Sequence, residues 1–219
     1  YKLLGGSIGF YGSTLNTRQY ATKGYLEKLI AQVFTGRERF EPGNPQEGYS
    51  PSPQERQSWL QISYMKEAYH TMGPKFTLGW MAEALYSSKN FSENYTATMM
   101  QAGEFAPTPH SKLMYNEAFR ANQYVAAGIK PIYVLNDMFQ FRTEFYGFTP
   151  IFPIKKNALN KAYYGKAFSR FEYMGEVSVI CHLPFGAISA YVNHYSSPRR
   201  EWNVGMTIGW QLFNYRFVE

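Results

Sequence analysis

Aspartate and cysteine are almost absent from this sequence of 219 residues. The single cysteine, Cys181, excludes an internal disulfide and a cysteine-based metal cluster. No apolar run approaches the roughly 18 residues that a membrane-spanning helix needs, which excludes a helical membrane protein. The net charge is +6, but lysine and arginine form only isolated pairs such as Lys155-Lys156 and Arg199-Arg200. Without a compact basic cluster, we do not expect a nucleic-acid partner.

Aromatic residues, in contrast, are abundant. The chain contains 19 Tyr and 17 Phe, and aromatic residues make up 18% of it, yet its mean hydropathy is −0.40. A transmembrane β-barrel combines these properties because its outer face carries aromatic girdles and its inner face stays polar. A soluble all-β binding module, with aromatic side chains contacting carbohydrate, remains an alternative.

Strict alternation of apolar and polar residues indicates β-strands. It is clearest in EWNVGMTIGWQLF (201–213), and it recurs in KFTLGWMAEALY (75–86), FQFRTEFYG (139–147) and SRFEYMGEVSVICHL (169–183). The less apolar face of these segments carries charges of both signs in mid-strand. A soluble sandwich and a barrel can both show this pattern, but the strand lengths and the aromatic content favour a barrel.

The sequence predicts one all-β domain over 1–219, an antiparallel up-and-down transmembrane β-barrel segment of nine strands. Short links alternate with the long loops 37–56, 88–121 and 150–167, and the stretch 96–101 is taken as part of a long loop with local β-structure. Because bacterial single-chain barrels have even strand numbers, we expect further strands upstream. The nine predicted strands span 2–12, 22–36, 57–69, 75–87, 122–134, 138–149, 168–182, 185–195 and 202–213.

Several stretches resemble one family of bacterial outer-membrane barrels. They are NTRQYATKG (16–24), YNEAFRANQY (115–124) and the terminal NVGMTIGW (203–210). They resemble the surface-antigen superfamily, which includes outer-membrane protein assembly factors and two-partner-secretion transporters. FRTEFYGF (141–148) and GWQLFNYRF (209–217) are most similar to the barrel of patatin-like outer-membrane proteins.

The resemblance implies that the chain is the C-terminal part of a 16-stranded barrel in the bacterial outer membrane. It implies that Arg120 reaches into the barrel and pairs with a carboxylate, for which Glu144 is the candidate; an exposed Arg120 is the alternative. It further implies an assembly signal at Asn203, Gly205, Ile208 and Trp210, which the outer-membrane assembly machinery would read. Membrane lipids and lipopolysaccharide are the other expected partners, and the expected role is to anchor or translocate an upstream periplasmic domain or to assist protein translocation.

A nucleophile motif, Gly-x-Ser-x-Gly, occurs around Ser7, but its surroundings argue against catalysis. The motif works on a strand-to-helix turn, whereas the residues after Ser7 alternate like a strand. A patatin-type lipase also needs an aspartate followed by glycine, and the only aspartate, Asp137, precedes Met138. We therefore expect no catalytic, cofactor-binding or metal-binding residue in this chain. A patatin-like lipid hydrolase whose active site lies upstream is the alternative.

Overall fold

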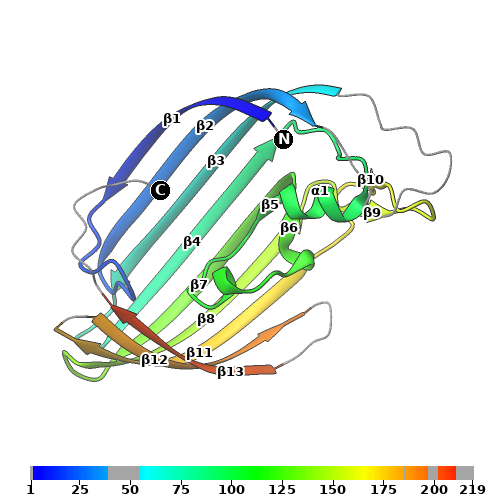
Figure 1. Cartoon of the computed structure of the whole chain (residues 1–219). Helices are drawn as coiled ribbons and strands as arrows, with labels where there is room; N and C mark the ends of the chain where they lie inside the picture. The colour runs from blue at the N-terminus through cyan, green and yellow to red at the C-terminus, as the bar shows by residue number, and fades with distance from the viewer. Residues whose placement is uncertain (1, 39–54, 185, 197–201, 211–219) are drawn as a thin grey trace.

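The computed structural model describes residues 2–38, 55–184, 186–196 and 202–210. Nine strands form one antiparallel sheet whose spatial order follows the chain (Figure 1). The strands are β1 (Lys2–Ser13), β2 (Gly24–Glu38), β3 (Glu55–Thr71), β4 (Phe76–Ser87), β7 (Gln123–Val134), β8 (Phe139–Pro150), β11 (Glu172–Leu183), β12 (Gly186–Tyr195) and β13 (Trp202–Trp210).

Smaller elements lie in two of the long links between strands of the sheet, 88–122 and 151–171. The first link holds a short helix, two 3-10 turns and a two-residue ladder; the second holds a small hairpin. They are α1 (Tyr95–Gln101), β5 (Gly103–Glu104), η1 (Ser111–Leu113), η2 (Glu117–Phe119), β6 (Arg120–Ala121), β9 (Ile154–Lys156) and β10 (Ala162–Tyr164).

The nine predicted strands are confirmed, with one boundary wrong by four residues. The strand predicted to begin at residue 168 begins at Glu172. Phe168 adopts a left-handed backbone with φ 50°, and its N–H donates to the carbonyl of Ile151, so the chain is still turning there. The predicted strand end at 211–213 lies outside the described residues.

Link lengths alternate between the two ends of the sheet, as predicted. The links 72–75 and 135–138 lie at one end, here called the short-link end, and 88–122 and 151–171 lie at the other, the long-link end. This alternation places the links 88–122 and 151–171 at the same end of the sheet. Residues 88–121 of the first link are called the inner segment below.

The faces of the sheet have the reverse of the usual polarity for a water-soluble protein. On β8, Phe141 and Phe145 are 45% and 53% exposed, whereas Arg142 and Glu144 between them are 2% and 6% exposed. β11 repeats the pattern, with Val177 exposed and its neighbours buried. The apolar face is therefore the convex, outward one, and the charged face is turned inward.

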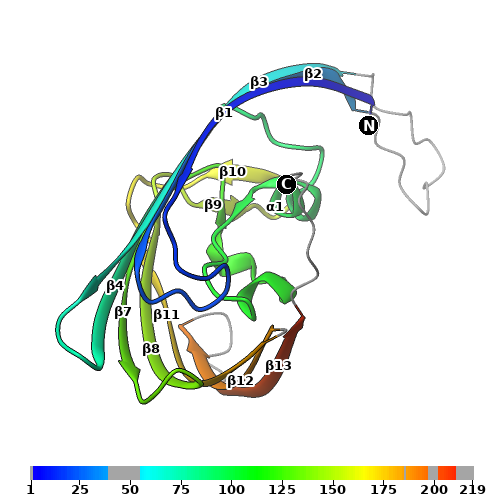
Figure 2. The ribbon, with the colours of Figure 1, turned by 90° about the vertical axis from the view of Figure 1, so that its left-hand side faces the viewer.

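The sheet curves but does not close. β1 pairs only with β2 and β13 pairs only with β12, so each has one free edge among the described residues. Figure 2 shows the sheet as an open C around the inner segment. The structure thus has nine antiparallel strands in a curved sheet, without the ring closure of a complete barrel.

The inner segment fills the concave side of the curved sheet. Phe105 and Phe119 are each 1% exposed; Phe105 packs against Tyr124 of β7 and Phe148 of β8, and Phe119 packs against Phe148. Burying each such ring contributes roughly 1.5–3 kcal/mol. The expected local β-structure is present as β5 and β6, but 96–101 lies in helix α1 because the Asn94 side chain accepts from the N–H of Ala97 and caps the helix.

Candidate functional site

Arg120 lies at the start of β6, inside the concave side of the sheet. Its guanidinium pairs with Glu104 on the neighbouring β5, with Nη2 and Oε2 2.6 Å apart. The same group packs over the ring of Tyr115 at 4.8 Å. The Arg120 side chain is turned toward the concave side and is only 12% exposed.

Arg120 also completes the hydrogen bonding of helix α1. Its Nη1 lies 3.2 Å from the carbonyl oxygen of Met100 and 3.3 Å from that of Ala102. The last carbonyls of a helix lack partners within the helix, and a cation there also complements the helix dipole. Arg120 therefore holds α1, β5 and β6 together as one folded unit.

The predicted Arg120–Glu144 pair is wrong. Glu144 on β8 pairs with Arg142 of the same strand, with Nε and Oε1 3.0 Å apart. Arg142 and Glu144 are two residues apart and share the inward face, so neither needs a partner from the inner segment. Glu104, the actual partner of Arg120, lies 16 residues before it within the same link, and no motif marked it.

The inward face of β3, β7 and β8 carries a buried cluster of charges, here called the inner charge cluster. Lys130 Nζ lies 3.0 Å from Glu67 Oε1 and packs near the rings of Tyr69 and Tyr146. The Tyr146 hydroxyl donates to Glu144 at 2.8 Å. Buried charges are tolerated only when paired and hydrogen-bonded, as these are. The cluster comprises Glu67, Lys130, Arg142 and Glu144, with Tyr69 and Tyr146.

The link between β1 and β2 (14–23) folds inward onto this cluster. Arg142 Nη1 donates to the carbonyl of Ala21 at 2.9 Å, and Gln140 Nε2 donates to the carbonyl of Tyr20 at 3.1 Å. Tyr20 has a left-handed φ of 56°, which turns its ring inward, where its hydroxyl lies 2.7 Å from Ser189 Oγ of β12. The first hairpin is thereby tied to β8 and β12, on the far side of the sheet.

A cavity of about 740 Å³ opens between the links at the short-link end. Gln140, which is 1% exposed, and His182 line it and lie 2.8 Å apart between their Nε2 atoms. The lining is mixed polar and apolar and includes Lys23, Lys75 and Asp137.

The inner segment is held at its other end by β12. The Asn193 Nδ2 donates to His110 Nδ1 at 2.5 Å, and the Asn203 Nδ2 of β13 donates to Asn193 Oδ1 at 3.2 Å. Burial lowers the pKa of His110. Burial also raises the pKa of Glu104, and the Arg120 guanidinium offsets this rise only in part. Hydrogen bonds thus run from the edge strand β13 through β12 into the inner segment.

The predicted assembly-signal residues lie along β13. Asn203 contacts Asn193 as described, and Gly205 lies so close to the ring of Tyr191 that any side chain there would collide with it. Ile208 faces outward and is 62% exposed. The side chain of Trp210 lies outside the described residues.

Ser7 lies in the middle of β1, opposite Gln32 of β2, and not on a strand-to-helix turn. His194 faces outward against Trp202, with ring centroids 4.9 Å apart, and His70 accepts from the indole of Trp80 at 3.4 Å. Within the described ranges, no three His, Cys, Asp or Glu side chains are grouped so that they could hold a metal ion.

The part of the chain that the structure describes has no helix long and apolar enough to cross a membrane. No protein-family model, no curated protein sequence and no solved structure matches this chain.

Proposed function

We propose that this chain is the membrane-embedded part of a bacterial outer-membrane β-barrel. One observation carries the proposal: the nine-stranded sheet exposes an apolar convex face and buries a charged concave face. Outer-membrane barrels have this polarity because their outer face contacts lipid tails and their inner face contacts water and polar side chains. In water, the exposed apolar area would favour aggregation.

The free edges of β1 and β13 fit the same proposal. An unpaired strand edge in lipid costs several kcal/mol per backbone group, so a membrane-embedded sheet must close. β1 and β13 are the first and ninth strands of an alternating sheet and run parallel to each other. An odd number of additional strands, such as the seven that complete a 16-stranded barrel, would join them with antiparallel pairs only.

We further propose that the barrel anchors or translocates an attached periplasmic domain, or assists protein translocation, without covalent chemistry in this segment. The resemblance to the surface-antigen superfamily supports this role, and so does the inner segment. Because the inner segment occupies the concave side, passage of a polypeptide would require it to move. The partners would be membrane lipids, lipopolysaccharide and, through the terminal strand, the assembly machinery.

Two alternatives remain. The complete protein could be a patatin-like lipid hydrolase with its active site upstream; a second Gly-x-Ser-x-Gly followed by Asp-Gly in the upstream sequence would favour it. The chain could instead be a soluble all-β binding module. Its exposed aromatic side chains favour this alternative, but its buried inward charges do not.

A matched pair of variants separates a membrane protein from a soluble one. Val177 on β11 and Leu159 in the β9–β10 link are 55% and 79% exposed. In a soluble protein, arginine at either site is harmless. In a lipid-facing wall, Val177→Arg costs roughly 2–4 kcal/mol near mid-membrane, whereas Leu159→Arg costs nothing.

The readout is insertion of the full-length protein into the outer membrane, followed by the change in gel mobility between unheated and heated samples. We expect Leu159→Arg to behave like the wild type and Val177→Arg to accumulate outside the membrane fraction. A wild-type protein that stays soluble and shows no heat-dependent shift would refute the proposal.

A further inference from the structure

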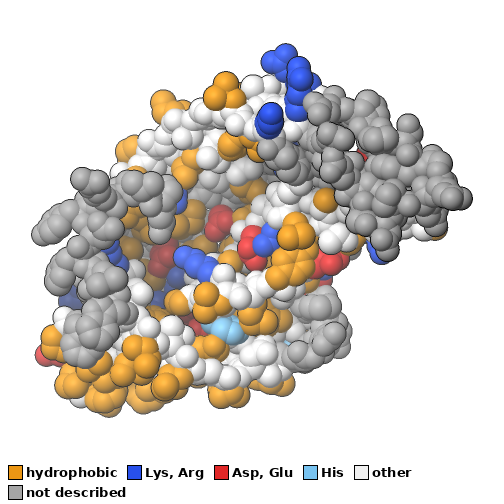
Figure 3. Space-filling view, in the orientation of Figure 1, with side chains coloured by type: hydrophobic (Ala, Val, Ile, Leu, Met, Phe, Trp, Pro, Cys, Tyr) orange, Lys and Arg blue, Asp and Glu red, His pale blue; other side chains and the backbone are white. Residues whose placement is uncertain are grey.

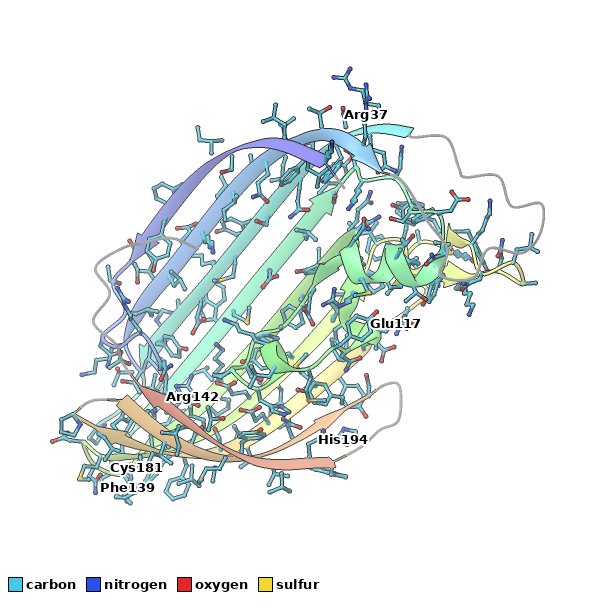
Figure 4. The ribbon with its side chains drawn as sticks, in the orientation of Figure 1. Arg37, Glu117, Phe139, Arg142, Cys181 and His194 are labelled. Atoms are coloured by element: carbon cyan, nitrogen blue, oxygen red, sulfur yellow. The ribbon has the colours of Figure 1, made fainter. Side chains whose placement is uncertain are left out.

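Three basic side chains lie side by side at the long-link end of β1, β2 and β3. Lys2 is the cross-strand partner of Arg37, and Arg37 is the cross-strand partner of Arg56. All three are exposed. Figure 4 shows Arg37 projecting from the end of the sheet, and Figure 3 shows Lys and Arg side chains gathered along this rim. The three residues are called the basic row.

The basic row faces outward. Cross-strand partners point to the same side of a sheet, and two residues along from Lys2, Arg37 and Arg56 lie Leu4, Thr35 and Ser58. Leu4 is 75% exposed on the convex face. The basic row therefore lies where the apolar face ends, at the long-link end of the sheet, which is where the proposed membrane would end.

This arrangement of like charges is unfavourable unless an anion joins it. Like charges directly opposite each other on neighbouring strands destabilise a sheet, and here two such pairs share Arg37. Among the residues that the structure describes, none of the three has an ion-pair partner. The described side chains supply no carboxylate that pairs with the row, and the side chains of the adjoining Glu38 and Glu55 lie outside the described residues.

The ligand must combine an anionic head with an apolar body. Strands lie about 4.8 Å apart, so the row spans roughly 10 Å, which suits a head carrying more than one phosphate oxygen group. Arginine binds phosphate through two parallel hydrogen bonds. Farther along the same face, Val33 and Leu60 lie four residues from Arg37 and Arg56 and are 58% and 38% exposed, and Ile8 lies six residues from Lys2 and is 76% exposed. These side chains offer contact to acyl chains.

We propose that Lys2, Arg37 and Arg56 form a binding site for the phosphate groups of lipopolysaccharide in the outer leaflet. The inference rests on the proposed membrane location, with the long-link end at the cell surface. It goes beyond general contact with lipid because it assigns a phosphorylated headgroup to three named side chains.

The test uses the full-length protein refolded in uncharged detergent and titrated with fluorescent lipid A. The variant carries Lys2→Gln, Arg37→Gln and Arg56→Gln together. A matched control carries Lys155→Gln, Lys156→Gln and Lys161→Gln, which removes the same charge from exposed residues of the β9–β10 hairpin and its turn. Removing like-charge repulsion should not impair folding, which the heat-dependent gel shift checks.

We expect the basic-row variant to bind lipid A about 100-fold more weakly, since each basic residue near an anionic surface contributes a several-fold gain in affinity. The control should bind like the wild type. Equal affinity of wild type and basic-row variant, in a protein that does insert into membranes, would overturn this site alone. A protein that fails to insert would overturn the proposed function and the site together.

Competition of inorganic phosphate and pyrophosphate with lipid A tests whether the site binds a lipid headgroup or free phosphate. If the site is built for the lipid, neither ion should displace lipid A at concentrations comparable to that of the lipid, because they lack the acyl chains that contact Ile8, Val33 and Leu60. Displacement at equal concentration would show a site for free phosphate and would overturn the lipid assignment.

Discussion

Arg120 and Glu104 face each other across the two-residue ladder of β5 and β6, with Nη2 and Oε2 2.6 Å apart. Both residues belong to the inner segment, and Arg120 additionally donates to carbonyls at the end of α1. The pair therefore folds the inner segment onto itself and does not fasten it to the wall. The inner segment attaches to the wall through Phe105 and Phe119 and through the hydrogen bond between Asn193 and His110.

Replacement of Arg120 by glutamine should loosen the inner segment without unfolding the sheet. The change leaves Glu104 half-buried without its partner and uncaps α1, which together should cost about 2 kcal/mol. Hydrogen exchange over 95–121 should accelerate about 30-fold, while exchange in β7 and β8 should stay unchanged. Lys66→Gln, which breaks the Lys66–Glu27 pair between β3 and β2, is the control and should leave 95–121 unaffected.

A double-mutant cycle distinguishes the two candidate partners of Arg120. Combining Arg120→Gln with Glu104→Gln should give a coupling energy of about 1–2 kcal/mol, as for directly contacting charges. Combining it with Glu144→Gln should give a coupling near zero, because Glu144 pairs with Arg142. A larger coupling to Glu144 would restore the pair predicted from the sequence.

The inner charge cluster should matter more for stability than any surface pair. Arg142→Gln leaves Glu144 buried without its closest cation and removes the hydrogen bond to the carbonyl of Ala21. Loss of one member of a buried pair costs about 3–5 kcal/mol. Unfolding in urea, followed by the heat-dependent gel shift, should therefore occur at clearly lower urea concentration.

Lys66→Gln serves as the control here too, because the side chains of the Lys66–Glu27 pair are 36% and 27% exposed. Pairs exposed to that degree contribute little to stability, so its unfolding midpoint should stay close to that of the wild type. Equal losses for Arg142→Gln and Lys66→Gln would show that the cluster is hydrated and not buried.

The sheet could be predicted from the sequence because its signal is local. Alternation along a strand sets which face each side chain takes, and Phe141, Arg142 and Val177 all lie where that alternation placed them. Strand ends were less predictable; Phe168 alternates like a strand but adopts a left-handed turn.

The site was less predictable because its contacts join distant parts of the chain. Arg142 binds the carbonyl of Ala21, 121 residues away, and backbone carbonyls leave no trace in residue identity. The charges of the cluster were visible as mid-strand charges, but their partners depend on the register between strands. The wrong partner for Arg120 arose in the same way, because residue identity does not tell whether Glu104 or Glu144 lies beside it.

The docking of the inner segment should weaken as the pH falls. Asn193 Nδ2 can only donate, so His110 Nδ1 must accept, and it does so only in the neutral imidazole. Burial lowers the pKa of His110, so docking is favoured above the ordinary histidine pKa and is progressively lost as the pH falls through the lowered value. Hydrogen exchange over 105–115, corrected for intrinsic rates, should rise between about pH 7.5 and about pH 5.

Other groups near His110 also titrate or hydrogen-bond, so a variant is needed to assign the effect. Glu176 contacts Asn193, and the rings of Tyr191 and Tyr195 lie against His110. His110→Gln keeps an acceptor but removes the titration. If the variant shows the same rise in exchange as the wild type, the pH dependence belongs to Glu176 and not to His110.

Two glycines in the sheet should respond to alanine in opposite ways. A Cβ at Gly128 of β7 would collide with the ring of Tyr146 and lie 2.7 Å from the carbonyl oxygen of Phe145, whereas a Cβ at Gly6 of β1 meets nothing within 4 Å. Because Tyr146 is held by Glu144, its ring cannot move away without breaking that bond. Gly128→Ala should therefore destabilise the protein by about 1–3 kcal/mol, while Gly6→Ala should be neutral or stabilise it by up to about 1 kcal/mol. Urea unfolding of the two variants measures the difference, and equal midpoints would mean that the inward side of β7 is less tightly packed than Tyr146 and its neighbours indicate.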